Sequence, residues 1–508
     1  MTVLCAIPVS RFSILWLPEA PAEQSACIAE VLAKIRDSAT LACANWPHIY
    51  SASPRLRILR PATSGQEAGL KAAAQKFDWP VETIDAAPEM LSRLCDLAVV
   101  AQKEDLACVG LTPALILSAG TDGMAFSIGR AHPLSADRRQ ENDILPSAEP
   151  DIVAAAFAPP ADPLEAKKLT EFFEEPNEAP VGRRAYDFLL RLIGQRPEAT
   201  RAPDASWDLA FSLAAQARPG ARASIEAIHA AYARADALAL AYGERWRSTL
   251  VSRSMLLLMM NAVSGLIGAL SPAASLVTIP IQILVTAAIF YESRVARGRR
   301  WREKWLDYRR LAESIRVERF LVLCGAASTP VPGADWVAWM VRRVTRAAAP
   351  ADPLRETAAA DVLNHLANVE IADQVAYHVS AMLRFRRLDR GFRRAALGML
   401  FVFVALGVIF AALAFSVHFS NRFRLSSAIG LALTAAPALY ALLDGVRRDL
   451  DVVRQAERSD FLAASLKNLA KAIAEMPPTV ATARAAAVKA AEIMRDDVAR
   501  WRNVLEVL

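Results

Sequence analysis

The stretch MLLLMMNAVSGLIGAL, residues Met255–Leu270, decides the fold, because it is a continuous apolar run without a charge. After a Ser-Pro pair, a second run, SLVTIPIQILVTAAIFY, ends at Tyr291. Two further runs follow at Ala396–Phe419 and Leu425–Leu443. Each run is just long enough to cross about 30 Å of hydrocarbon as a helix. The sequence therefore predicts an all-α membrane region with four transmembrane helices in two hairpins, at about 252–270, 274–291, 396–419 and 425–443.

Basic residues cluster on one side of both predicted hairpins. Three arginines between Arg245 and Arg253 precede the first run, and six basic residues between Arg294 and Lys304 follow the second. Arginines also precede the third run and follow the fourth, although two lie in the connector between them. Because basic flanks stay in the cytoplasm, this pattern predicts that both termini are cytoplasmic. The alternative, four buried core helices, would make the arginine flanks a coincidence.

Composition agrees with a membrane protein that carries large aqueous parts. The 508 residues are 54% hydrophobic and 22% charged, with a net charge of +6. The arginines lie beside the apolar runs and form no stripe interleaved with aromatic residues, which argues against nucleic acid as a partner. Six cysteines occur without C-x-x-C spacing or nearby histidine pairs, so the sequence indicates neither a metal site nor a disulfide framework.

A few polar side chains interrupt the first two apolar runs. They are Asn261, Ser264, Gln282 and Thr286. Such residues either line a water-filled path or form hydrogen bonds between helices, and the sequence leaves both uses open. Gly265 and Ala269 have small-xxx-small spacing, which allows close approach of helices and makes a homo-oligomer plausible.

The N-terminal part alternates between predicted strands and helices. A first strand, Phe12–Leu17, is followed by strands at 55–59, 80–85 and 96–101, with helices between the later ones. Residues 112–120, TPALILSAG, are expected to form a helix, and residues 123–129, GMAFSIG, a final strand. This alternation predicts an α/β Rossmann-like domain with a parallel, doubly wound sheet over residues 1–135.

Two loops of this domain follow predicted strands and are candidate ligand sites. One contains Ser64, Gly65 and Glu67, and the other contains Gly110 and Thr112. In doubly wound sheets, ligands bind beyond the carboxyl ends of strands, where helix N-termini offer free N–H groups to anions.

Similar charged helices follow the two hairpins. The segment from Arg300 to Phe320 combines alternating charges with apolar residues at helical spacing, and the segment from Arg447 to Ile473 does the same. Ala456-Glu457 is expected to correspond to Ala312-Glu313. The pattern indicates a tandem duplication of one helix–hairpin–helix unit, over residues 204–335 and 336–475.

The first charged helix carries a motif with a family likeness. The order W-x-x-x-W-x-x-Y-R-x-L-A-E-x-x-R, just after a two-helix hairpin, resembles the SLATT family, the SLOG-associating two-transmembrane domains of bacteria. Its residues here are Trp301, Trp305, Tyr308, Arg309, Leu311, Ala312, Glu313 and Arg316. The likeness runs from about residue 204 to residue 473. The two N-terminal loops look similar to SLOG nucleotide-sensing loops, with Ala68 at a position where that family has a basic residue and Leu111 in place of a glycine.

The resemblance implies a function. It implies a multi-pass protein of the bacterial inner membrane that acts without catalysis, forming a pore or perturbing the bilayer when a nucleotide-derived ligand reaches its sensor in a conflict system. The expected partners are the lipid bilayer and further copies of the chain, and no cofactor beyond that ligand is implied. Trp305, Tyr308, Arg309, Glu313 and Arg316 either contact a ligand or pack their helix against its neighbours.

Two other functions remain as alternatives. The chain could serve as a structural membrane anchor or scaffold whose SLOG-like domain is inactive. A membrane-bound nucleotide-processing enzyme would need paired carboxylates, a triad or a P-loop, and the soluble parts carry no such motif. Residues 136–203 are expected to form a linker with short helices, and residues 476–508 a C-terminal amphipathic helix that begins after Pro477-Pro478.

Overall fold

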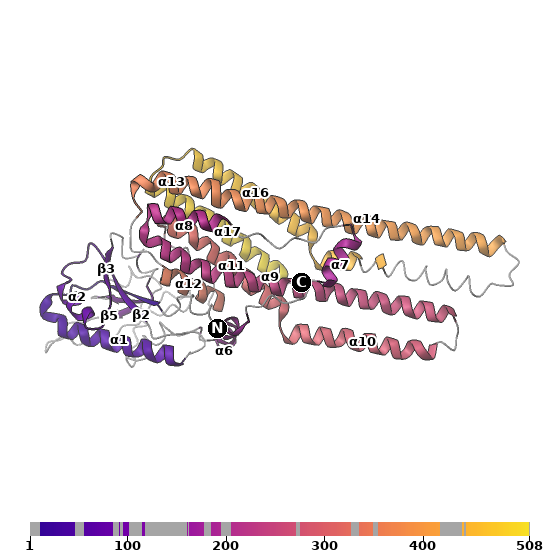
Figure 1. The fold of residues 1–508 in the computed structure, drawn as a ribbon, viewed down its shortest axis with the longest axis horizontal. Helices are drawn as coiled ribbons and strands as arrows, with labels where there is room; N and C mark the ends of the chain where they lie inside the picture. Colours follow the sequence, from indigo (N-terminus) through magenta and orange to yellow (C-terminus); the bar gives the residue numbers. More distant parts are fainter. Residues whose placement is uncertain are drawn as a thin grey trace, which may run out of the picture.

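A computed structural model describes most of the chain. The described residues are 11–45, 55–84, 91, 95–100, 114–116, 160, 162–176, 184–194, 205–270, 275–326, 335–348, 354–416, 439–440 and 443–506. This part of the protein is mostly helical, with one small parallel sheet near the N-terminus (Figure 1).

The sheet has five parallel strands in the order β3-β2-β1-β4-β5. They are β1 (Arg11–Trp16), β2 (Arg55–Pro61), β3 (Val81–Ile84), β4 (Leu97–Val100) and β5 (Ala114–Ile116). The chain starts in the middle, builds outward through β2 and β3, and then returns to the other side for β4 and β5. The order reverses between β1 and β4, which is the topology of doubly wound folds. The predicted small parallel sheet is therefore confirmed.

One element of this domain differs from the prediction. Residues 112–120 were expected to be a helix, but Ala114–Ile116 forms strand β5, which pairs with β4. A short apolar run has no clear period, so pairing with a neighbouring strand can decide its conformation. The predicted strand at 123–129 lies outside the described residues.

Alternating side chains of β1 join different cores. Phe12, Ile14 and Trp16 belong to a large cluster that includes α1 (Ser25–Asn45), α2 (Ala68–Gln75) and much of the helical body. Leu15 faces the opposite side, in a small cluster with residues of β2 and β4. Because successive side chains of a strand point to opposite faces, this sheet has one face buried against the rest of the protein.

The helical body forms from residue 163 onward. Its helices are α6 (Pro163–Glu174), α7 (Arg184–Leu192), α8 (Ala205–Ala217), α9 (Pro219–Leu270), α10 (Ser275–Gly298), α11 (Trp301–Leu323), α12 (Trp336–Ala348), α13 (Ala359–His365), α14 (Ala372–Ser416), α16 (Val452–Ala474) and α17 (Val480–Glu506). A π-helical turn, Leu366–Ile371, joins α13 to α14. The linker expected at 136–203 thus contains α6 and α7.

Two long helices, α9 and α14, run from the helical body into a projecting tip, which consists of the ends of α9, α10 and α14 (Figure 1). α9 has 52 residues and α14 has 45, so they are about 78 Å and 68 Å long at 1.5 Å per residue. α11 packs along α9, and α16 packs along α14. Both α11 and α16 have 23 residues and start after a residue with positive φ, Arg300 at 48° and Asp451 at 46°.

Counting from these breaks gives an alignment of α11 with α16 that differs from the expected pairing of Ala312-Glu313 with Ala456-Glu457. Counted from the breaks, Leu311-Ala312 corresponds to Leu462-Ala463, and both Ala312 and Ala463 are buried. Ala456 therefore lies two helical turns before the position assigned to it from sequence. The charge patterns of α11 and α16 repeat too loosely to fix an alignment, whereas the break and the buried face give one.

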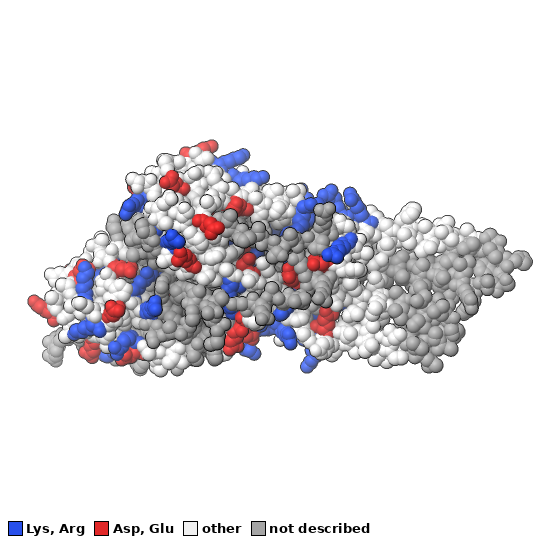
Figure 2. Space-filling view, viewed as in Figure 1, with Lys and Arg blue, Asp and Glu red and all other residues white. Residues whose placement is uncertain are grey.

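Two described segments, within Ile279–Leu323 and Glu356–Ile409, are long and apolar enough to cross a membrane, and only 11% of each apolar window is buried. Large apolar side chains there face outward, as at Leu284 (71% exposed) and Phe401 (75% exposed). Figure 1 shows the ends of α9, α10 and α14 projecting together, and Figure 2 shows basic residues at the base of this tip.

The other two predicted spans are described only in part. The backbone of α9 is helical to Leu270, but its side chains from residue 261 lie outside the described set, as do residues 417–438. Two of the four predicted spans therefore meet the length and apolarity criteria within the described residues.

Candidate functional site

The predicted ligand loop after β2 is closed by the chain itself. A Cβ added at Gly65 would collide with the Glu19 carboxylate, so the missing side chain makes room for that group. The Gly69 amide, at the start of α2, donates to the Ala20 carbonyl at 2.7 Å, and the Ala20 amide donates to Gln66 at 2.8 Å. An anion at this helix N-terminus would meet Glu19 and an N–H group that is already bonded.

The remaining residues of this loop also have partners inside the domain. The Ser64 amide donates to Pro61 at 3.1 Å and closes a turn. Glu67 accepts hydrogen bonds from Lys71 and, at 2.9 Å, from Thr83, and these bonds lower the pKa of its carboxyl group. The second predicted loop, with Gly110 and Thr112, lies outside the described residues.

A buried arginine lies beneath the closed loop. Arg60, at the end of β2, is 1% exposed and donates to the Gln66 carbonyl at 3.3 Å, which holds the loop on the sheet. Burial lowers the pKa of its guanidinium, and Glu67 at 3.9 Å opposes that shift. A sequence pattern could not single out Arg60, because it stands among several arginines in the strand RLRILRP.

The aromatic residues of the motif helix α11 pack inside the body. Tyr308 is 2% exposed, and its ring centroid lies 5.6 Å from Phe172, 5.5 Å from Tyr242 and 5.9 Å from Trp336. Trp305 packs closely over Gly243 of α9, where a Cβ would collide with the indole. These rings join α6, α9, α11 and α12 into one core.

The charged residues of the motif join α11 to its neighbours. Arg309 donates to Asp236 of α9 and to the Tyr377 hydroxyl of α14, both at 3.3 Å, and it pairs with Glu313 one turn on. Arg316 lies 3.9 Å from Glu313. Each of these contacts links two helices or two turns of α11, so the geometry accounts for the residues as packing groups without a ligand.

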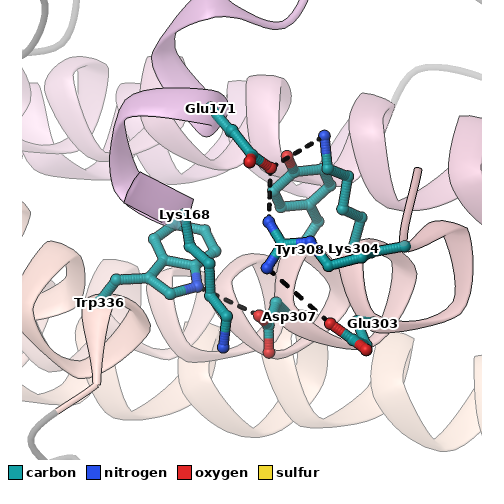
Figure 3. A pocket seen from close by; sticks show the side chains of 8 residues that line it. Lys168, Glu171, Glu303, Lys304, Asp307, Tyr308 and Trp336 are labelled. Atoms are coloured by element: carbon teal, nitrogen blue, oxygen red, sulfur yellow. Dashed lines mark hydrogen bonds and ion pairs between the residues drawn. The ribbon is translucent and has the colours of Figure 1, made fainter. Parts of the chain in front are cut away.

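A shallow cleft lies between α6 and the start of α11 (Figure 3). Its lining residues are Lys168, Glu171, Arg300, Glu303, Lys304, Asp307, Tyr308 and Trp336. Arg300 bonds Glu171 at 2.6 Å, and Lys304 lies 3.2 Å from the same carboxylate. Burial alone would raise the pKa of Glu171, but the bonds from these two cations outweigh it and leave the pKa lowered. The charges in the cleft thus neutralise one another.

The junction between the sheet and the helical body centres on Asp96, just before β4. This carboxylate is fully buried, accepts from the Ser13 amide at 2.9 Å, and pairs with Arg343 and, at 3.1 Å, Arg346 of α12. Arg343 also lies over the Phe12 ring, 4.2 Å from its centroid. The amino end of the sheet is therefore bonded directly to α12.

Two of the four polar residues predicted in the apolar runs, Gln282 and Thr286, have described side chains. Gln282 is half-buried on α10, and Thr286 is exposed, with its hydroxyl 3.7 Å from the Met260 sulfur of α9. This contact joins the two helices of the first hairpin. The side chains of Asn261 and Ser264 lie outside the described residues.

Comparison of the chain with protein-family models, with curated proteins and with solved structures finds no match. Among the described residues there is no cluster of three His, Cys, Asp or Glu side chains that could hold a metal ion. The candidate sites therefore rest on the geometry given above.

Proposed function

We propose that this chain is a signal-responsive membrane effector in which the N-terminal α/β domain acts on two transmembrane hairpins. In this proposal four helices span the bacterial inner membrane, both termini are cytoplasmic, and a nucleotide-derived signal changes the packing of the hairpins so that they form a pore or perturb the bilayer. The likeness to SLATT and SLOG domains supports the signal and the outcome.

The observation that carries the proposal is the continuity between sheet and tip. The buried Asp96 bonds β1 and β4 to α12, and one hydrophobic cluster includes residues of the sheet, α9, α11 and α12. α9 then runs without a break from that cluster into the exposed apolar tip. A change at the sheet would thus act, through these side-chain contacts, on a helix that reaches the membrane.

The arginine flanks and the exposed tip support the membrane topology. Large apolar side chains, such as Leu284 and Phe401, point outward from these helices. Their exposure to water is unfavourable, whereas lipid would cover them. Basic residues at the base of the tip agree with a cytoplasmic body.

The test is leakage of a small dye from liposomes that contain the full-length protein, across a panel of nucleotides and nucleotide sugars. We expect leakage with at least one of these ligands, and we expect Asp96→Asn to weaken it while the exposed Asp37→Asn does not. Inserted protein that never changes dye flux with any ligand would contradict the effector proposal.

The closed loop at Gly65 favours a second candidate, a membrane anchor or scaffold with an inactive ligand domain. The Glu19 carboxylate lies against Gly65, where it would repel an anion, and the Ser64 and Gly69 amides are already bonded. Under this alternative the silent leakage panel is the expected result, and residues of the closed loop could be changed without effect on membrane insertion.

A further inference from the structure

α7 (Arg184–Leu192) is a short helix with two different faces. Leu189 and Leu190 are buried, at 2% and 5% exposed. Phe188 and Leu192, one turn apart, are 58% and 61% exposed, so they form an outward apolar face. Arg191 is exposed beside them. A helix with this composition is typical of the interface between water and lipid, where the apolar side enters the acyl boundary.

The buried face of α7 places it at the base of both hairpins. It packs in one cluster with Val251 of α9, with Leu388 and Phe392 of α14, and with residues 443, 446 and 452. Val251 and Phe392 each lie four residues before an apolar run starts, at Met255 and Ala396. Figure 1 shows α7 beside α14 where the tip leaves the body. α7 therefore lies at the level where the proposed spans enter the membrane.

The surface around this level is strongly basic. Its exposed arginines include Arg294 and Arg297 of α10, Arg299 just after it, Arg387, Arg390, Arg393 and Arg394 of α14, and Arg448. Of the nearby carboxylates, Asp389 and Asp444 are half-buried and paired with arginines, while Asp449 is exposed, so the arginines outnumber the exposed carboxylates here. A basic belt at the edge of an apolar region attracts the anionic headgroups of phospholipids.

We infer that α7 is an interfacial helix that inserts Phe188 and Leu192 among anionic phospholipids and joins the two hairpins at the membrane surface. The inference rests on the proposed membrane topology and adds a lipid class and a lipid-contacting element to it. A lipid partner is favoured over a second copy of the chain because the apolar face lies at the level where the apolar runs start and because the charge around it is basic.

The test places the photo-crosslinking residue benzoylphenylalanine at position 188 of the full-length protein in liposomes. Phosphatidylcholine is compared with mixtures of phosphatidylcholine and phosphatidylglycerol, and the α7 peptide is analysed by mass spectrometry. The same residue at Phe401, on the exposed tip, reports membrane insertion, and at Leu41, exposed on α1, it reports background. We expect lipid adducts at 188 and 401, none at 41, and a severalfold preference for phosphatidylglycerol at 188.

The outcomes separate this inference from the proposed function. If position 401 gives lipid adducts while position 188 gives no adduct, or only crosslinks to protein, the role of α7 is overturned and the membrane topology stands. No adducts at either position would refute insertion itself. Equal yields with both lipids would overturn the anionic preference. In a variant with R387Q, R390Q and R394Q, the adduct at 188 should remain while its preference for phosphatidylglycerol falls.

Discussion

Replacing Asp96 by asparagine should detach the sheet from α12. The carboxylate is fully buried, and it compensates two arginines of α12 while it accepts the Ser13 amide. Asparagine has nearly the same shape, so it keeps one acceptor oxygen. Its amide group, however, would face guanidinium N–H groups, and the charge that offsets Arg343 and Arg346 would be lost.

The expected cost follows from the burial of these groups. Removing one partner of a buried ion pair destabilises a protein by about 3–5 kcal/mol, because the other charge stays buried without compensation. A domain is typically stable by about 5–15 kcal/mol, so this loss is a large fraction of the total. In hydrogen-exchange terms it corresponds to opening that is about 150 to 4,000 times more frequent.

The assay is hydrogen exchange of the amides in β1 and β4, measured on full-length protein in detergent or nanodiscs. The matched control is Asp37→Asn, since Asp37 is 67% exposed and pairs with an exposed arginine, where about 0–1 kcal/mol is expected. If Asp96→Asn accelerates exchange in these strands no more than Asp37→Asn does, the buried pair does not hold the sheet, and the coupling argument fails.

Three further predictions concern the loop, the cleft and the thiols. Gly69→Ala should cost about 1–3 kcal/mol, because its Cβ would meet the Pro21 backbone carbonyl, whereas Gly65→Ala should cost less than about 1 kcal/mol, because the exposed Glu19 side chain can rotate away. Equal losses in thermal unfolding would contradict this packing. Burial raises the pKa of Glu171, but the hydrogen bonds from Arg300 and Lys304 lower it by more. The stabilisation of α6 by this carboxylate is therefore present above pH 4.5 and is lost as the pH falls through the lowered pKa. Glu171→Gln should abolish that pH-dependent loss, measured by hydrogen exchange of α6. Burial raises the pKa of Cys43 to about 11, so iodoacetamide at pH 8 should modify the more accessible Cys27 first in the native protein, and equal rates by mass spectrometry would contradict this.

Local patterns explain which parts of the fold could be predicted. The apolar run at Met255–Leu270 and the alternation of strands and helices near Arg55 are properties of a few neighbouring residues, and they predict helical hairpins and a parallel sheet without knowledge of distant contacts. The strand at Ala114–Ile116 could not be predicted in this way, because a three-residue apolar segment takes its conformation from its pairing with β4.

The sites were harder to predict because their partners are far apart in sequence. The sequence places Trp336 at the start of the second predicted unit, yet the helix that begins there, α12, meets the N-terminal sheet, where Arg343 pairs with Asp96 from 247 positions away. Gly65 was expected to leave room for a phosphate, and the structure uses that room for Glu19. A glycine in a loop indicates close approach of another group, but the sequence alone does not say whether that group is a ligand or the chain itself.

The motif residues of α11 also connect the two helical units that the sequence predicts. Counted from the breaks before α11 and α16, the positions of Tyr308 and Arg309 correspond to Ser459 and Asp460, so the second unit lacks the motif. Arg309 of α11 also donates to the Tyr377 hydroxyl of α14, the helix that leads into the second predicted hairpin. The helix that follows the first predicted hairpin, α11, is therefore bonded to the helix that leads into the second, α14. Because α11 also packs on α12, a displacement of the sheet at Asp96 would reach both predicted hairpins through α11, which is the coupling that the effector proposal needs.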